Sequence, residues 1–170
     1  MPPGKPLSFD PIAEARRQWE GHGWGEAAAM TAATSIMRAQ QLVQREVDAA
    51  LAPLGLTFAR YEVLALLSFS RAGALPLGKV GERLMVHPAS VTNAVDRLEA
   101  QALVERRSHP SDRRRVLAAI TDRGRAVTTE ATTALTDVRF GLGSLSSAQC
   151  DELFGLIRHL RLGVDDFDVA

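Results

Sequence analysis

In Pro88-Ala-Ser-Val-Thr-Asn-Ala-Val-Asp-Arg-Leu98, apolar residues recur at helical spacing, at Val91, Val95 and Leu98 and then at Ala102. This spacing predicts a helix that opens at His87-Pro88. The next stretch, Val104-Glu-Arg-Arg-Ser-His-Pro-Ser-Asp-Arg-Arg-Arg-Val116, predicts a hairpin with strands over 105–108 and 115–121 around a Pro-Ser-Asp turn. A polar helix beside an arginine-rich hairpin suits duplex nucleic acid better than a metabolite cleft.

Further helices are expected on both sides of this pair. They cover 11–20, 26–52, 57 to just before 73, 77–84, 121–142 and 146–162, with Asp10, Thr57, Thr121 and Ser146 as N-terminal caps. Ser146 also forms a capping box with Gln149. Two short helices followed by a hairpin, within 57–121, have the order of a winged helix-turn-helix.

The sequence therefore predicts a mainly α protein in three parts. An N-terminal arm and extra helix occupy 1–25, a helical dimerisation region occupies 26–56 and 122–170, and the DNA-binding winged helix-turn-helix occupies 57–121. The last helix carries the apolar stripe Leu153, Leu156, Ile157 and Leu160 outside the central part. An apolar helix stripe needs a partner, so we expect a homodimer in which terminal helices of two chains interlock.

Charge is unevenly distributed along the chain. The 170 residues hold 20 basic and 20 acidic side chains, but Lys79–Arg125 holds ten Lys/Arg against six Asp/Glu. A cationic face on an acidic body is indicated. Only Lys5 and Lys79 are lysine, and the arginine fork suits phosphate and guanine, although a GC-rich genome gives the same bias.

Composition also argues against several classes of protein. The single cysteine, Cys150, excludes an internal disulfide, and no membrane span or secretion signal is apparent, so we expect a cytoplasmic protein. The four histidines have no metal-binding spacing, and no nucleophile elbow or catalytic carboxylate pair is visible. We therefore expect no enzyme activity, no metal and no cofactor.

The helix that begins at Pro88 offers candidate contacts to a major groove. Burial of its apolar stripe turns Ser90, Asn93 and Arg97 outward, with Thr92 beside them. Asn93 is expected to bond an adenine edge, whereas Ser90 and Arg97 suit phosphates. The alternative is an ordinary solvated helix face.

The hairpin offers a second set of contacts. Arg113 and Arg114 lie near its tip, where a guanidinium can enter a narrow minor groove. Asp112 is expected to be structural and to orient a neighbouring arginine, and His87 is expected near a phosphate. The alternative is a solvated run of charges.

The chain resembles the MarR family of bacterial transcription regulators from about Ala27 to Val164. The resemblance lies in Leu77-x-x-Val80-x-x-x-Leu84, Val95-Asp-Arg-Leu98-Glu, His109-Pro-Ser-Asp112-Arg-Arg114 and Ile120-Thr-Asp-x-Gly124. It implies a dimeric winged-helix regulator that binds a pseudo-palindrome in double-stranded DNA. Such regulators are usually repressors released by a small ligand or an oxidant.

The extra N-terminal helix resembles that of the urate-responsive branch of this family. Trp19 and Arg106 match the ligand residues of that branch, whereas Glu62 stands in place of an aspartate and Ala94 in place of an arginine. The lost cation disfavours urate and leaves another, less charged aromatic ligand. Alternatively, Trp19 only anchors the N-terminal helix and Glu62 only pairs with Arg106.

A different class of function fits the same fold. A winged helix can serve as a protein–protein interaction module without specific DNA binding. The arginines of the hairpin and Asn93 favour the DNA-binding regulator.

Overall fold

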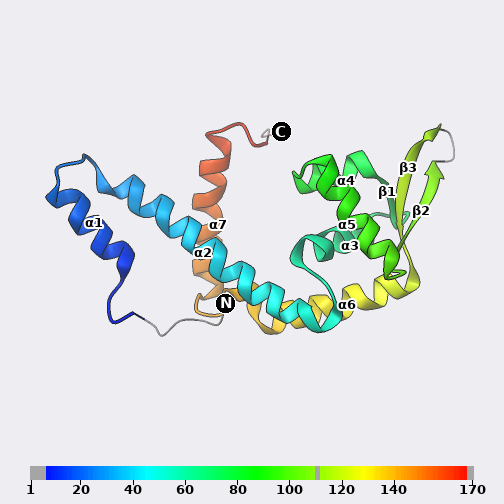
Figure 1. Cartoon of the computed structure of the whole chain (residues 1–170), viewed down its shortest axis with the longest axis horizontal. Coiled ribbons are helices and arrows are strands. Elements are labelled where there is room, and N and C mark those ends of the chain that lie inside the picture. The colour runs from blue at the N-terminus through cyan, green and yellow to red at the C-terminus, as the bar shows by residue number, and fades with distance from the viewer. Residues whose placement is uncertain (1–6, 110–111, 168–170) are drawn as a thin grey trace. The chain divides into compact units, whose positions relative to one another are not determined.

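Helices account for most of the chain, and one small sheet accompanies them (Figure 1). The computed structural model describes residues 7–109 and 112–167, except for the side chains of residues 109 and 112–115. The chain divides into two compact units, Met1–Arg45 and Glu46–Ala170.

The first unit contains α1 (Pro11–Gly21) and most of α2 (Ala27–Leu51). Asp10 caps α1 as predicted, because its Oδ1 accepts from the backbone N–H groups of Ile12 and Ala13 at 2.9 and 3.3 Å. The α1 helix ends near two tryptophans that meet edge to face, with the ring centroids of Trp19 and Trp24 5.4 Å apart.

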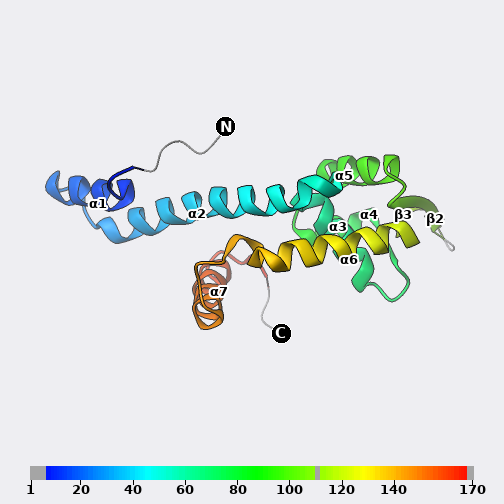
Figure 2. The same ribbon diagram turned by 90° about the horizontal axis from the view of Figure 1, so that it is seen from below.

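The second unit begins with the end of α2 and continues through the elements in this order: η1 (Ala52–Leu54), α3 (Phe58–Phe69), β1 (Ala74–Pro76), α4 (Leu77–Leu84), α5 (Pro88–Ala100), β2 (Val104–His109), β3 (Asp112–Ile120), α6 (Asp122–Asp137), η2 (Arg139–Gly141) and α7 (Ser147–Leu162). Within this unit α6 runs beside α3 (Figure 2). Side chains from α3, α4, α5 and β3 form a buried core of Leu64, Leu67, Val80, Val95, Leu98 and Ala118.

Helices α4 and α5 form the helix-turn-helix. Met85 adopts the left-handed conformation (φ 55°) and ends α4. Gly81 lies where the two helices meet, since a Cβ there would lie 3.2 Å from the Val86 carbonyl oxygen and 3.3 Å from a methyl group of Val91. The absence of a side chain therefore lets α5 pack directly on α4.

The sheet is antiparallel, with the strand order β1-β3-β2. The hairpin of β2 and β3 is confirmed and places Arg106 opposite Ala118. The sequence does not predict β1, because three residues are too few to show an alternating pattern. Pro76 is tolerated there because β1 is an edge strand. The expected winged helix-turn-helix is thus confirmed.

Two of the other predicted caps are confirmed and one is not. The Thr121 hydroxyl accepts from the Gly124 N–H at 2.9 Å, and Ser146 and Gln149 form the predicted capping box. Thr57 occupies the N-cap position of α3, but its hydroxyl accepts no backbone N–H. The Phe58 N–H instead donates to the carboxylate of Asp48 at 3.1 Å, so an acid from α2 replaces the local cap.

The α6 helix ends at Asp137, earlier than the predicted boundary near 142. Arg139 and Phe140 adopt positive φ angles of 48° and 52°, and the chain turns through η2. Neither residue is of a type that favours this conformation, so the sequence gives no stop signal here.

The α7 helix, confirmed close to its predicted bounds, buries none of its residues. Four of its apolar side chains are exposed by 40% to 71%, and they are Leu153, Phe154, Leu156 and Leu160. Among the described helices, no single one is both long and apolar enough to cross a membrane, although α2 with η1 and α3 pass that test as a bent pair.

Candidate nucleic-acid interface

The α5 helix divides into a buried face and an exposed face, as its sequence predicts. Val91, Val95 and Leu98 are buried by at least 98%. The four side chains of α5 proposed for DNA contact are all exposed, namely Ser90, Thr92, Asn93 and Arg97. A helix whose outward side chains are short can lie deep in a major groove.

Ala102 is not part of the buried stripe, contrary to the predicted spacing. The helix ends at Ala100, and Ala102 is exposed with a φ of 57°. The Leu103 N–H then donates to the Leu98 carbonyl at 3.0 Å. This left-handed termination turns the chain from α5 into β2, and the helical period does not continue beyond it.

Two predicted contact residues also bond within α5. The His87 Nδ1 accepts from the Ala89 N–H at 3.2 Å, so the ring caps the helix. The Thr92 hydroxyl donates to the Pro88 carbonyl at 3.1 Å. The Thr92 oxygen therefore remains an acceptor, while its proton is already used.

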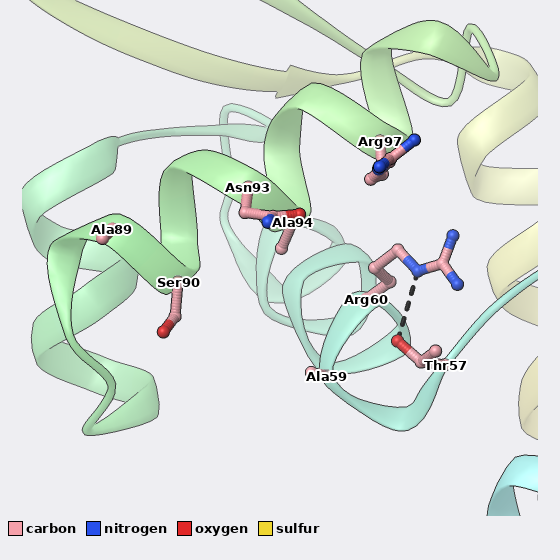
Figure 3. A pocket seen from close by; sticks show the side chains of 8 residues that line it. All are labelled: Thr57, Ala59, Arg60, Ala89, Ser90, Asn93, Ala94 and Arg97. Carbon is pink, nitrogen blue, oxygen red and sulfur yellow. Dashed lines mark hydrogen bonds between the residues drawn. The ribbon is translucent and has the colours of Figure 1, made fainter.

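A hollow of about 750 Å³ lies between α5 and the start of α3, and we call it the α3–α5 hollow (Figure 3). Ser90, Asn93 and Arg97 line it from α5. Thr57 and Arg60 line it from the other side, and the Arg60 Nε donates to the Thr57 hydroxyl at 3.2 Å. Three alanines complete the lining, Ala59, Ala89 and Ala94.

Sequence reasoning missed Arg60, although one signal points to it. Arg60 lies in the first turn of α3, where the helix dipole favours an acid and disfavours a cation. A cation at this unfavourable position indicates that Arg60 has a functional role.

The predicted wing contacts lie at the limit of the described structure. The backbone of Asp112, Arg113 and Arg114 belongs to β3, and their side chains lie outside the described part. The pairing of β2 with β3 shifts register between Ser108 and His109. The roles of these three residues remain predictions.

Arg106, a proposed ligand residue, instead joins the base of the wing to α5. Its guanidinium forms ion pairs with Asp96 and Glu99, and its backbone N–H donates to Glu99 Oε1 at 3.0 Å. Burial lowers the pKa of Arg106, but hydrogen bonds and charges of the two carboxylates outweigh burial and raise it overall. The suggested pair with Glu62 is wrong, because β2 packs on α5 and brings other acids to Arg106.

The other two proposed ligand residues, Glu62 and Trp19, belong to different units of the chain. Glu62 on α3 is half-buried, and burial raises the pKa of its carboxyl. Trp19 belongs to the first unit, and its indole N–H is buried without an acceptor among the described residues. Their role in binding a ligand remains a prediction.

Comparison with known proteins agrees with this architecture. The MarR family model matches residues 56–116, which run from the turn before α3 into β3. Sco5413 of Streptomyces coelicolor, a MarR family transcriptional regulator, is 54% identical, and the match covers 83% of this chain and 98% of that chain with a TM-score of 0.76. Sco3205 of the same organism, solved in complex with DNA, is 26% identical over 83% of this chain and 94% of that chain, with a TM-score of 0.75.

A bacterial repressor is similar over a shorter stretch. The HTH-type transcriptional repressor MdtR of Bacillus subtilis is 34% identical over 90 residues, which are 53% of this chain and 57% of MdtR. The match thus spans little more than half of that repressor. These relatives are regulators and not enzymes. Because it has the winged helix-turn-helix and matches Sco5413 over 98% of that chain at 54% identity, the chain belongs to the MarR family of transcriptional regulators.

Proposed function

We propose that the protein is a homodimeric repressor that binds a pseudo-palindromic operator in double-stranded DNA. The observation that carries the proposal is the two-sided α5 helix. Its Val91, Val95 and Leu98 are locked into the core, so the opposite face is held rigidly outward. That face combines an amide, two hydroxyls and a guanidinium, which are groups that bond base edges and phosphates.

The roles of the outward residues follow from their chemistry. Asn93 carries an amide that can bond adenine at two positions, so it selects a base. Ser90 and Arg97 bind phosphates and set the position of the helix. Arg113 and Arg114 of the wing reach the neighbouring minor groove. A regulator of this kind works in the compartment that holds the DNA, which we expect to be the cytoplasm.

The proposed dimer is supported by the exposed apolar side of α7. Leu156 and Phe154 are exposed by 71% and 63%, which is costly for a helix that remains in water. We expect light scattering at micromolar concentration to give twice the chain mass of 18.4 kDa. Leu156→Asp should give a monomer, and a monomeric wild-type protein would contradict the proposal.

Release by a small effector completes the proposed function. We expect a small aromatic or anionic effector. The aromatic pair of Trp19 and Trp24 supports an aromatic ligand, and the half-buried carboxyl of Glu62 is separately able to accept a hydrogen bond. The ligand should be identified by its ability to displace the protein from its operator. If Trp19 only anchors α1, Trp19→Phe will leave the response to effector unchanged.

Selection of bound duplexes from a random pool at near-physiological salt tests the proposal directly. We expect an inverted repeat with half-sites about one helical turn apart. Arg113→Ala should weaken binding to every duplex and flatten the salt dependence. If no consensus is recovered and binding vanishes at moderate salt, the chain is instead a winged-helix protein–protein interaction module.

A further inference from the structure

We propose that Arg60 and Arg97 together hold one backbone phosphate of the bound duplex in the α3–α5 hollow. This inference rests on the proposed function and adds a second helix to its DNA contacts. The helix α3 would then fix how deeply α5 enters the groove.

The two guanidinium groups lie on opposite sides of the same hollow. Figure 3 shows Arg97 extending from α5 and Arg60 extending from α3 into one gap. Arg97 is exposed and Arg60 is half-buried. Each can therefore reach a group that enters the hollow from solvent.

Neither cation is neutralised within the described part of the chain. The hydrogen bond of Arg60 goes to the uncharged Thr57 hydroxyl, and no described carboxylate pairs with Arg60 or Arg97. The acid next to Arg97 in sequence, Asp96, pairs with Arg106 of β2 and does not line the hollow. The described lining of the hollow thus holds two cations and no acid.

This arrangement is unfavourable without an anion and favourable with one. Two like charges that share a hollow repel each other, and Arg60 also opposes the dipole of α3. A phosphate between them removes both costs and accepts hydrogen bonds from each planar fork. Ala59 and Ala94 line the hollow with single methyl groups and leave room for a phosphodiester.

The position of the hollow indicates that the phosphate belongs to DNA. Ser90 and Asn93 line it too, so a duplex that places its groove on α5 brings its backbone to the same surface. A phosphate contact positions the protein without selecting a base. Arg60 should therefore contribute equally to binding of operator and of unrelated duplex.

The test compares Arg60→Ala with wild-type protein on operator and random duplex over a range of salt concentrations. We expect about a tenfold loss of affinity per half-site on both duplexes, with an unchanged ratio between them. The plot of log affinity against log salt should become shallower by about 0.9 per half-site. Thermal unfolding should show no loss of stability, because a repulsion has been removed.

A matched control and a second variant separate the phosphate contact from a general charge effect. Arg71→Ala removes the same charge just beyond the far end of α3, which runs about 14 Å from Arg60 to its last residue, Phe69, so that salt screens it. It should change affinity much less than Arg60→Ala. Arg60→Lys keeps the charge without the fork and should fall between Arg60→Ala and wild type.

Replacing single operator phosphates by uncharged methylphosphonates identifies the shared group. One position per half-site should weaken wild-type binding and have little effect on Arg60→Ala and on Arg97→Ala. The inference is overturned if Arg60→Ala binds like wild type, or if the two variants become insensitive to different phosphates. If wild-type protein binds no duplex, the proposed function fails and this inference fails with it.

Discussion

Arg106→Ala removes the side chain that joins the base of the wing to α5. Its partners Asp96 and Glu99 are partly exposed, by 57% and 40%. Exposed ion pairs contribute about 0.2–1 kcal/mol each, and the two carboxylates left behind repel each other by about 0.2–0.5 kcal/mol. The bond from the Arg106 backbone N–H to Glu99 survives the substitution. We therefore expect the free energy of unfolding to fall by about 1–2 kcal/mol.

Denaturant unfolding and fluorescence anisotropy with labelled duplexes measure the two consequences. In thermal unfolding, the melting temperature should fall by about 2–4 °C per kcal/mol for a chain of this size. Operator and random duplex should both bind more weakly, because two unpaired carboxylates now lie on the helix that approaches DNA. Arg107→Ala is the matched control, since Arg107 pairs with Glu105 on its own strand and not with α5.

The result that refutes this reasoning is specific. If Arg106→Ala keeps wild-type stability and duplex affinity but no longer responds to effector, Arg106 is a ligand residue and not a link between wing and helix. Adding Asp96→Asn and Glu99→Gln to Arg106→Ala should restore part of the duplex affinity. No recovery would show that the loss comes from a displaced wing and not from the uncompensated charges.

Four further substitutions test other parts of the structure. Asn93→Ala should cost about 1–3 kcal/mol of operator affinity and relax selectivity at one base, and an unchanged selected consensus would contradict this role. Gly124→Ala would place a Cβ 2.1 Å from the Leu103 carbonyl oxygen, so it should destabilise the fold by more than the roughly 1–3 kcal/mol of ordinary overpacking. Gly78→Ala has open space around its Cβ and should stabilise the fold by up to about 1 kcal/mol. Denaturant unfolding measures both changes. Burial raises the folded-state pKa of Glu62, so wild-type stability falls as pH rises from the ordinary value through the raised one. Glu62→Gln should therefore gain stability relative to wild type at pH 7 but not at pH 4, and an equal difference at both pH values would show that this carboxyl is not responsible.

The sequence alone predicted those features that depend on near neighbours along the chain. Asp10, Thr121 and Ser146 cap their helices by accepting from backbone groups two or three residues away. The exposed face of α5 likewise follows from the spacing of its buried valines and Leu98. Such contacts are set by helical geometry and residue type, so no tertiary information is needed to predict them.

The tertiary structure decided which distant side chains meet. Asp48 of α2 accepted from the Phe58 N–H at the start of α3, Arg106 paired with Asp96 and Glu99, and Arg60 came to share a hollow with Arg97. Helical spacing determines which face of a helix is buried, but not which side chain from another element lies against its exposed edge. A long arginine can reach any of several acids, and only the packing of β2 on α5 and of α3 beside α5 selects among them.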